Sequence, residues 1–565
     1  MKPAWRFRLA LGALSVVGAL LCSRSLADGL CLDDRLMLST VAGPRILPAS
    51  PPFDLFTFTT GQASVNAGLI ARGVGPWYTS PDLRISFWRP LASLSHTLDF
   101  SLFPGHPAWM HLENLIWYAA LVVAVGLLYR RFLGTGWVAL LAVGLYAVHD
   151  AHGLSVGWII ARNTLMGATF AVLSLFAHDR FARDGWSPGR ILGPILFAGA
   201  LLSSEATVTL LAYLAAHAVW VHRASIGARA RAMAPYAAIT CAWLIYYVAT
   251  GHGASGSGVY VDPFREPLAF ASGLPGRVLV DLAGQLSGTG SPPALAFISM
   301  IAFTLCAVPL ALVHRTAAFF LAGLAGSLLI VAGLSPDPRQ LLHTGLGAFP
   351  LAVMIVAGAA GRLVPCPRRG WWRALAVVSA LGTLLLLGVL SAVRMPGQAE
   401  LASTTQRAFD RYPLFANPKA AAGKTVVVVN AADPLLAGNW SARDNARTDT
   451  PARIWSLTYV RGPVLVTRTG ARELSIYMPA GHTSAPSGRM FRRDPLRAGD
   501  SVMLPGMRID VMTDGSATTP QVVRYRFDMP LDDPGLVWLA WNGIRYGAFR
   551  IPDLGRSVGV SAQPL

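Results

Sequence analysis

The chain contains few charged residues: Asp, Glu, Lys and Arg together make up 13% of its 565 residues, whereas 53% are hydrophobic. An average soluble domain carries about 25% charged residues. A chain with this composition and a mean hydropathy of +0.47 has too much apolar surface to bury in a water-soluble core. The scarcity of charge therefore excludes an ordinary soluble protein, and we predict a polytopic membrane protein.

Cysteine is scarce as well, with five residues in the whole chain. The cysteines are scattered and form no CxxC pair, so their spacing indicates neither a disulfide framework nor a cysteine-based metal site. Basic residues outnumber acidic ones, 47 against 29, and the formal net charge is +18. No basic run interleaved with aromatic residues accompanies this charge, so we expect membrane lipids and no nucleic acid as partners.

Apolar runs recur through the first 393 residues, and a helix needs roughly 20 apolar residues to cross the hydrocarbon core. We predict eleven spans, at residues 9–22, 115–128, 137–148, 154–177, 191–202, 206–221, 235–249, 294–313, 317–334, 341–360 and 374–393. The predicted fold is therefore mostly α-helical, a polytopic bundle of about eleven transmembrane helices.

Basic residues lie in alternate loops between these spans, whereas the loops 149–153, 203–205 and 335–340 carry only Arg339. Because Lys and Arg of short loops stay on the cytoplasmic side, we expect a cytoplasmic N-terminus and an external C-terminus. The alternative for the first run is a cleaved signal peptide, since "SLA" at residues 25–27 resembles a cleavage site. Either alternative leaves Asp33 and Asp34 outside.

The composition changes near residue 424, where short β-branched and aromatic runs such as "TVVVVN" and "QVVRYRFD" alternate with Gly, Pro, Asp and Ser turns. This pattern predicts an antiparallel, sandwich-like β-domain on the outer side of the membrane. The predicted domains are a membrane domain over 1–394 with a large external loop at 23–114, a connector over 395–423, and a soluble β-domain over 424–565.

Two adjacent carboxylates, Asp33 and Asp34, follow the first span in a chain otherwise poor in acids. Such a pair can act as a general base on a hydroxyl group or hold a divalent metal. The structural alternative is a helix N-cap, or an ion pair with Arg35.

Three polar residues lie near the external end of the second span: Arg89, His111 and Asn114. Arginine suits an anionic phosphate, because its planar guanidinium stays charged and offers several donors. The structural alternative places Arg89 at lipid headgroups and uses His111 and Asn114 to cap the span.

A short external turn gathers His149, Asp150 and His152, and Arg162 lies about two turns into the following helix. Because an ionisable group inside a span is costly, Arg162 is a functional candidate facing the interior or a polar cavity. Extension toward the headgroups is its structural alternative. The two histidines and the aspartate leave a divalent metal open, against a hydrogen-bonded turn.

Glu205 and Arg339 lie in two further external connections, "LLSSEATVTLL" and "SPDPRQLLHTG". Glu205 can cap the next helix or point into an external cavity, and Arg339 can contact headgroups. Together with the residues above, they place acids, histidines and arginines on one membrane face, where a site for an amphiphilic phosphate-bearing substrate would gather them.

At these residues the chain resembles the polyprenyl-phosphate-sugar-dependent glycosyltransferases of the GT-C fold, in particular the membrane portion of the transmembrane and tetratricopeptide-repeat O-mannosyltransferases and their bacterial relatives. The family pattern is an acidic pair after the first span, then "RPL", "HLxN", "HPxHxE…W…R", "SKE" and "ER". The matching positions here are Asp33, Asp34, Arg89, Pro90, Leu91, His111, Leu112, Asn114, His149, His152, Trp158, Arg162, Ser203, Glu205 and Arg339.

The resemblance implies inverting transfer of a sugar from a polyprenyl-phosphate donor to an acceptor hydroxyl of a glycan, lipid or protein. It implies Asp34 or Asp33 as the base, and Arg89, Arg162 or Arg339 as the group that stabilises the departing lipid phosphate. It also implies a multi-pass protein of the bacterial inner membrane with a periplasmic C-terminal domain. No cofactor is implied beyond a divalent metal, which is left open.

The chain departs from the family pattern at four positions, where Asp150, Leu154, Ser204 and Pro338 replace Pro, Glu, Lys and Glu. A β-domain also stands in place of the tetratricopeptide repeats. These departures put protein O-mannosylation, and mannose as the sugar, in question. Two alternatives to a transferase are an inactive GT-C-like membrane scaffold and a lipid or polysaccharide transporter.

Overall fold

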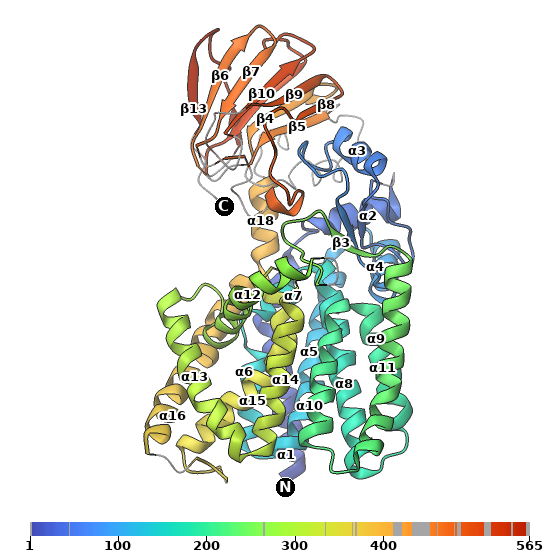
Figure 1. Ribbon diagram of the computed structural model, residues 1–565, viewed down its shortest axis with the longest axis vertical. Coiled ribbons are helices and arrows are strands. Elements are labelled where there is room, and N and C mark those ends of the chain that lie inside the picture. Colours follow the sequence, from blue (N-terminus) through green and yellow to red (C-terminus); the bar gives the residue numbers. More distant parts are fainter. Residues whose placement is uncertain are drawn as a thin grey trace. The chain divides into compact units, whose positions relative to one another are not determined.

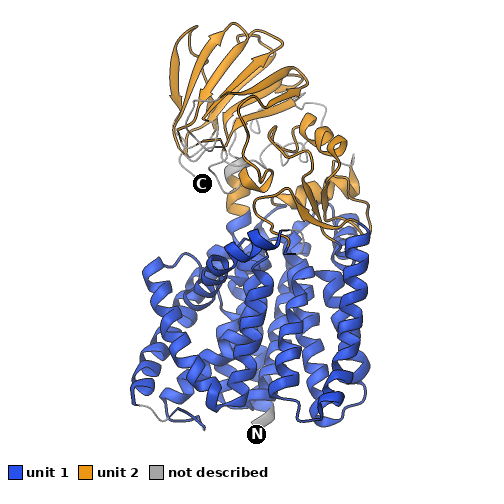
Figure 2. Cartoon of the chain, viewed as in Figure 1, with its two compact units in different colours: residues 1–30, 88–250, 263–402 blue, residues 31–87, 251–262, 403–565 orange. Residues whose placement is uncertain are grey.

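The computed structural model describes residues 3–43, 46–263, 266–333, 335–363, 365–367, 370–410, 421–431, 453–459, 462–479, 481–482, 488–512, 521–543 and 546–560. The chain forms two compact units (Figure 2): unit 1 comprises residues 1–30, 88–250 and 263–402, and unit 2 comprises residues 31–87, 251–262 and 403–565. Part of the predicted connector, residues 411–420, lies outside the described residues. The external segment 31–87 falls in unit 2, with the C-terminal strands.

Unit 1 is built from helices (Figure 1). Its α-helices are α1 (Pro3–Leu21), α4 (Pro90–Leu102), α5 (Pro107–Leu133), α6 (Trp137–Ala147), α7 (His152–Gly157), α8 (Arg162–Asp184), α9 (Gly189–Ser203), α10 (Leu210–Trp220), α11 (Ile226–Ala249), α12 (Pro267–Ser287), α13 (Pro293–Val313), α14 (Arg315–Val331), α15 (Leu341–Ala359), α16 (Gly370–Thr383) and α17 (Ser391–Ala399). Short 3₁₀ turns are η1 (Ser23–Ala27), η2 (Ile159–Ala161), η3 (Glu205–Thr209) and η4 (Pro338–Gln340), and η5 (Leu384–Leu390) is a π-helical stretch. Helix α18 (Leu401–Asp410) continues from unit 1 into unit 2.

Six stretches of the described chain are long and apolar enough to cross a membrane: Pro107–Leu133, Ile159–Asp184, Ile226–Ala249, Pro293–Val313, Pro338–Ala359 and Gly370–Arg407. Three shorter apolar helices accompany them: Trp137–Ala147, Gly189–Ser203 and Arg315–Val331. The prediction of a mostly helical, multi-pass membrane protein is confirmed. Helix α12 was missed from the sequence, because Pro275, Arg277 and Asp281 interrupt its apolar pattern.

Helix α7 packs against α17 through two glycines one turn apart, Gly153 and Gly157. A Cβ atom added at Gly157 would lie 1.8 Å from the backbone oxygen of Ala399, and one at Gly153 would lie 2.7 Å from that of Met395. Small residues at i and i+4 let two membrane helices approach at backbone distance. The sequence "HGLSVG" therefore fixes how closely α17 can lie on α7.

Unit 2 contains a six-stranded sheet of order β13-β6-β7-β10-β9-β8 and a four-stranded sheet of order β12-β11-β4-β5. Their strands are β4 (Thr425–Asn430), β5 (Arg453–Thr458), β6 (Val464–Gly470), β7 (Glu473–Tyr477), β8 (Ser501–Leu504), β9 (Met507–Met512), β10 (Val522–Phe527), β11 (Leu536–Trp541), β12 (Tyr546–Ala548) and β13 (Ser557–Val560). The six-stranded sheet is antiparallel, as predicted. The prediction of a wholly antiparallel domain is wrong for the second sheet, because β4 pairs in parallel with both β11 and β5.

The burial pattern explains this difference. Strand β4 carries a continuous apolar run, and five of its six residues are buried. Continuous apolar strands are typical of parallel pairing, because both of their faces are covered. The two sheets contact each other where the Tyr525 hydroxyl donates to the Leu457 oxygen at 2.7 Å and the rings of Phe527 and Trp538 meet at 5.3 Å.

The N-terminal part of unit 2 holds α2 (Asp33–Ala42), α3 (Ala63–Ala71) and a three-stranded sheet of β1 (Thr57–Thr60), β2 (Arg84–Ser86) and β3 (Gly253–Ser255). It is joined to the C-terminal strands by Trp77, whose indole nitrogen donates to the Leu457 oxygen at 2.9 Å. The rings of Trp77 and Tyr78 each lie 4.9 Å from the ring of His482, which is buried. This aromatic contact explains why residues 31–87 group with the β-domain.

We expect Gly157→Ala to lower the melting temperature of the detergent-purified protein by several degrees, because the added methyl group overpacks the α7–α17 contact at a cost of about 1–3 kcal/mol. Gly12→Ala is the matched control, since a Cβ at Gly12 in α1 meets no atom within 4 Å. That control should leave the melting temperature unchanged or raise it slightly. Equal melting temperatures for the two variants would contradict the close backbone contact.

The stability of unit 2 should fall as the pH drops from 6.5 to 4. Burial lowers the pKa of His482 from 6.5 to about 4. In that window the unfolded chain binds a proton that the folded chain excludes, so up to about 3 kcal/mol of stability is lost on acidification. Hydrogen exchange in β5 and β7 of the full chain, corrected for the intrinsic pH dependence, measures the effect. His482→Gln should reduce the pH dependence, whereas His106→Gln, at an exposed histidine of unit 1, should not; an unchanged slope in His482→Gln would refute the assignment.

Candidate functional site

Arg89 and Glu205, 116 positions apart in the sequence, form a bidentate ion pair in unit 1. Arg89 is the N-cap of α4, where Pro90 at the first helical position starts the helix, and Glu205 opens η3 directly after α9 has ended. The Arg89 Nε donates to Glu205 Oε2 at 2.7 Å, and its Nη2 donates to Oε1. The side chains are 14% and 26% exposed, so the pair lies at the edge of the helical unit.

Arg339 lies within electrostatic reach of this pair. Burial by itself would raise the pKa of the Glu205 carboxyl, but the positive charges of Arg89 and, more weakly, Arg339 outweigh burial and hold the pKa below its ordinary value. Glu205 is therefore ionised at neutral pH. We call Arg89, Glu205 and Arg339 the arginine–glutamate cluster.

Two neighbours orient Arg339 itself. Asp337 caps the turn η4 by accepting from the Arg339 backbone nitrogen, and its carboxylate also accepts from the Arg339 guanidinium at 2.5 and 3.0 Å. The guanidinium lies 5.2 Å from the centre of the Trp158 ring, in a cation–π contact. Asp337 was missed as a partner from the sequence, although its position two residues before Arg339 was a signal.

Arg162 is fully buried, and its donors are used within the protein. Its guanidinium reaches Asp99 on α4 at 2.5 Å and Glu113 on α5 at 2.7 Å. Further bonds go to Asn114 Oδ1, the Ser95 hydroxyl and the Met110 backbone oxygen, at 2.8, 2.8 and 2.9 Å. Arg162 thus ties the start of α8 to α4 and α5, and no spacing or motif in the sequence indicated these long-range partners.

Asn114 and His111 complete this region. The amide nitrogen of Asn114 donates to the backbone oxygens of Val156 and Trp158 at 3.1 and 2.9 Å, which holds the segment that carries the Trp158 ring. His111 is buried, and its Nε2 lies 3.5 Å from the Gly29 oxygen. The structure therefore brings Asn114 and Arg162 together and uses both to support the residues around Arg339.

Asp150 forms a separate junction. Its Oδ2 accepts from the backbone nitrogen and the hydroxyl of Thr289, both at 3.0 Å, and pairs with Arg394 at 3.2 Å. The Ser391 hydroxyl accepts from the Asp150 nitrogen at 2.7 Å and donates to its Oδ1 at 3.1 Å. The buried carboxylate thus joins the α6–α7 turn to α17 and the α12–α13 loop.

The two histidines of the same turn are buried among aromatic rings. The His152 Nδ1 lies 3.2 Å from the Tyr118 hydroxyl, and the rings of His149 and His152 are 5.2 Å apart. Across the described residues, no group of three or more His, Cys, Asp or Glu side chains is placed to hold a metal ion. The divalent metal left open from the sequence stays an untested expectation.

Asp33 and Asp34 lie in unit 2, at the first turn of α2. Asp34 is buried, and its Oδ2 accepts from the Cys31 nitrogen at 2.9 Å; Asp33 is partly buried. The preceding residue, Leu32, has a φ of 48°, which a branched side chain adopts at a cost in energy. The Leu32 nitrogen donates to Gln406 Oε1 of α18 at 2.8 Å, and this bond helps to hold the strained turn that presents the two carboxylates.

No family model matches the chain. Curated proteins similar to it include the protein O-mannosyl-transferase TMTC2 of Mus musculus, 27% identical over 221 residues, which cover 37% of this chain and 24% of that protein. Another is the protein O-mannosyl-transferase Tmtc1 of Drosophila melanogaster, 30% identical over 124 residues, which cover 22% and 14%. These matches confirm the resemblance stated from the sequence. The chain spans about a quarter of the length of the TMTC2 proteins it matches.

Two solved structures are similar to the chain at low identity. An oligosaccharyltransferase of Archaeoglobus fulgidus, tethered with an acceptor peptide, has a TM-score of 0.38 and 12% identity over 79% of this chain and 63% of its own. The apo structure of ArnT from Cupriavidus metallidurans has a TM-score of 0.39 and 12% identity over 78% and 84%. Both TM-scores lie below 0.5.

We expect Arg162→Gln to destabilise unit 1 by about 3–5 kcal/mol, because removing the guanidinium leaves the buried Asp99 carboxylate and the partly buried Glu113 carboxylate uncompensated. Thermal unfolding of the purified protein measures this loss. The triple variant Arg162→Gln, Asp99→Asn, Glu113→Gln should recover part of it, since the neutral groups no longer repel one another. A stable Arg162→Gln protein would show that Arg162 is not the anchor of α4 and α5.

Proposed function

We propose that this chain is a membrane glycosyltransferase that moves a sugar from a polyprenyl-phosphate donor to an acceptor hydroxyl by inverting displacement. The observation that carries this proposal is the arginine–glutamate cluster, in which the Arg89–Glu205 ion pair joins two segments distant in the sequence and the charge of Arg339 acts on Glu205. Its members stand where the resemblance expects "RPL", "SKE" and "ER". The match to O-mannosyl-transferases supports the same activity class.

In this proposal, Arg89 and Arg339 stabilise the phosphate as it leaves the anomeric carbon. Each guanidinium is held by a carboxylate, Glu205 or Asp337, so its planar fork is oriented before a substrate binds. Preoriented donors stabilise developing negative charge without reorganisation during the reaction. The ring of Trp158 supports the guanidinium of Arg339 on its face.

Asp34 or Asp33 serves as the base. As the acceptor oxygen bonds to the anomeric carbon and the bond to the lipid phosphate breaks, the carboxylate takes the hydroxyl proton. The strained backbone of Leu32, beside the pair, supports a functional role, because such strain clusters at active sites. Burial and the bond from Cys31 orient Asp34, whereas Asp33 is the more exposed of the two.

The remaining expectations belong to this proposal. The membrane domain would follow the GT-C plan with about eleven spans, and the two sheets of unit 2 would form a β-sandwich. The protein would lie in a bacterial inner membrane with a cytoplasmic N-terminus, and the transfer would occur on the periplasmic side, onto a glycan, lipid or protein acceptor. The alternation of basic loops supports this orientation.

We expect the purified full chain in nanodiscs to release free polyprenyl phosphate from one member of a panel of polyprenyl-phosphate sugars when envelope acceptors are added. The Asp33→Asn, Asp34→Asn double variant should lose at least a hundredfold in rate, the lower range for removal of a general base. Arg339→Gln should also lower the rate, because it removes a positive charge that stabilises the departing phosphate.

Asp82→Asn is the matched control, since Asp82 is an exposed carboxylate of the same unit. It should leave the release rate unchanged. Donor binding without turnover in the wild type, unaffected by the double variant, would contradict the transferase and favour the membrane scaffold.

A further inference from the structure

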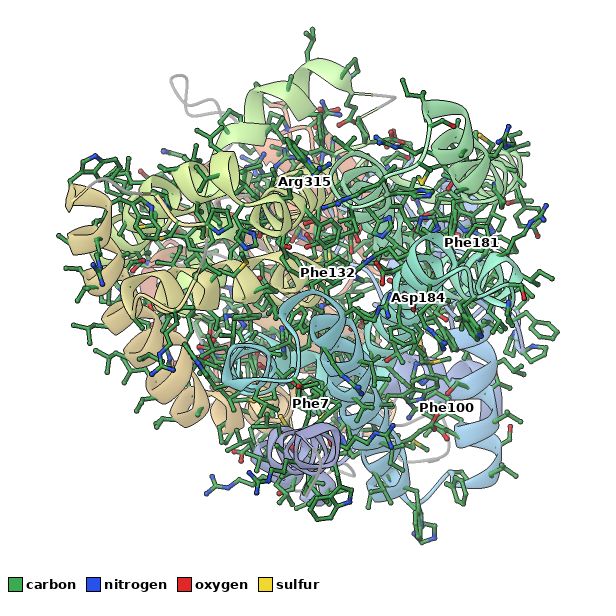
Figure 3. The ribbon with its side chains drawn as sticks, turned by 90° about the horizontal axis from the view of Figure 1, so that it is seen from below. Phe7, Phe100, Phe132, Phe181, Asp184 and Arg315 are labelled. Atoms are coloured by element: carbon green, nitrogen blue, oxygen red, sulfur yellow. The ribbon has the colours of Figure 1, made fainter. Side chains whose placement is uncertain are left out.

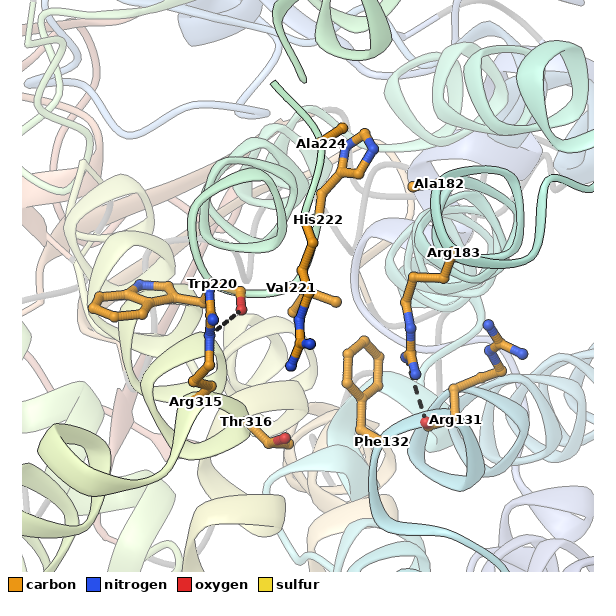
Figure 4. Close-up of a pocket in the computed structure, with 11 residues that line it drawn as sticks. Arg131, Phe132, Ala182, Arg183, Trp220, Val221, His222, Ala224, Arg315 and Thr316 are labelled. Atoms are coloured by element: carbon orange, nitrogen blue, oxygen red, sulfur yellow. Dashed lines mark hydrogen bonds between the residues drawn. The ribbon is translucent and has the colours of Figure 1, made fainter. Parts of the chain in front are cut away.

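A polar cavity of about 510 Å³ lies in unit 1 (Figure 4). It belongs to the end of the unit where α1 begins, because Arg130, beside the lining residue Arg131, lies 5.8 Å from the centre of the Phe7 ring. It lies between the last turns of α5, α8 and α10 and the first turn of α14. Its lining includes Arg131, Phe132, Arg183, Trp220, Arg223 and Arg315. Figure 3 views the helices from below and labels Phe132 and Arg315 of the lining, together with Asp184, the neighbour of the lining residue Arg183.

This cavity is separate from the arginine–glutamate cluster. Helix α8 begins at Arg162, which is bonded to Asn114, and ends at Asp184, one residue beyond the cavity-lining Arg183. A helix of 23 residues is roughly 34 Å long at 1.5 Å per residue. The cavity and the arginine–glutamate cluster therefore lie at opposite ends of the helices of unit 1.

The cavity has an excess of positive charge. Arg131 is neutralised by Asp179 at 2.7 Å and Asp184 at 2.8 Å, and Arg183 shares Asp179 at 3.3 Å. Arg223 and Arg315 have no carboxylate partner among the residues that the structure describes. Four arginines against two aspartates leave about two positive charges, which would suit one phosphate group.

The two unpaired arginines differ in their local contacts. The Arg315 Nε donates to the Trp220 backbone oxygen at 3.2 Å, which places its charge on the Trp220 side of the cavity (Figure 4). Arg223 is exposed and makes no hydrogen bond or ion pair within the described chain. Its guanidinium is therefore available to a ligand without loss of an internal contact.

Apolar groups form the rest of the lining. The Phe132 ring stacks on the Phe319 ring with their centres 4.7 Å apart. The Arg183 guanidinium lies over the Phe132 ring, 5.5 Å from its centre. Trp220 is 39% exposed and its neighbour Val219 is 55% exposed, at the end of an apolar helix. Such aromatic and aliphatic groups beside arginines are typical of the membrane interface, where headgroups and acyl chains meet.

We propose that this cavity binds the phosphate headgroup of an anionic phospholipid at the membrane face that carries the N-terminus. The unpaired arginines contact the phosphate, and the apolar lining contacts the glycerol and the first acyl carbons. Basic pockets between membrane helices recognise lipid phosphates in this way. A free phosphate ion would use only the charged part of a cavity of this volume, so the lining favours the lipid.

The test measures lipid binding by the full chain in neutral detergent, with native mass spectrometry during titration. The probes are dioleoyl phosphatidylglycerol, dioleoyl phosphatidylcholine, glycerol 3-phosphate and inorganic phosphate. We expect phosphatidylglycerol to bind more tightly than phosphatidylcholine, and both soluble phosphates to bind more weakly than phosphatidylglycerol. The Arg223→Gln, Arg315→Gln double variant should lose about tenfold or more in affinity for phosphatidylglycerol, since two charge-assisted contacts disappear.

The control is the Arg190→Gln, Arg231→Gln double variant, which removes the same charge from exposed positions at the start of α9 and α11. It should keep the affinity within about twofold of the wild type, because exposed charges act weakly at a distance in salt. The single variant Arg223→Gln tests the site without removing any described internal contact. It should lose affinity while keeping the wild-type melting temperature.

Three outcomes would overturn the proposal. Equal losses in the pocket and control variants would mean that net charge alone attracts the lipid. Equal affinity for phosphatidylglycerol and glycerol 3-phosphate would identify a site for soluble phosphate. If Arg223→Gln and the Arg223→Gln, Arg315→Gln double variant both kept the wild-type affinity for phosphatidylglycerol, the cavity would not be the lipid-binding site. None of these results depends on sugar transfer, so failure here leaves the proposed function standing, and the reverse also holds.

Discussion

The buried charge cluster around Arg162 is the interaction on which the arrangement of the candidate site depends. Asp99 belongs to α4, Glu113 and Asn114 belong to α5, and Arg162 begins α8, so one guanidinium fixes three helices to one another. Arg89 is the residue immediately before α4, and its place opposite Glu205 follows from where α4 is held. Asn114, oriented by Arg162, holds the backbone of Trp158. Arg89 and Arg339 are thus positioned by a third arginine, whose donors are used within the protein.

The different roles of these three arginines could not be predicted from the sequence. The sequence identified Arg89, Arg162 and Arg339 as equivalent candidates, because a guanidinium near a membrane face has the same properties in each place. What separates them is burial and the identity of the partners. Asp99 and Glu113 are distant in sequence from Arg162, and no local pattern pairs them. Only Asp337, two residues from Arg339, could have been recognised from spacing.

The fold could be predicted in part from the sequence. Long apolar runs identified the major helices, because helix length in a membrane is set by hydrocarbon thickness. Helix α12 escaped this criterion, since Pro275, Arg277 and Asp281 give it the composition of a loop. The strands of the β-domain were visible as β-branched runs, but the parallel pairing of β4 depends on burial of both faces. The grouping of residues 31–87 with those strands depends on Trp77 and Tyr78, whose aromatic character does not reveal their partners.

Asp150 has a consequence for how this chain can vary. Its carboxylate and backbone nitrogen are bonded by side chains of Thr289, Ser391 and Arg394, which come from two separate parts of the sequence, the α12–α13 loop and α17. Replacing this buried acid removes the carboxylate contacts to Thr289, Ser391 and Arg394, and Arg394 keeps its hydrogen bonds to the Thr289 oxygen, the Ser291 hydroxyl and the Ser287 oxygen. A substitution at Asp150 therefore acts on two distant segments at once, the α12–α13 loop through Thr289 and α17 through Ser391 and Arg394. The short α6–α7 turn is thus coupled through one carboxylate to the start of α17, so the position of that helix is specified by a side chain as well as by the glycines of α7.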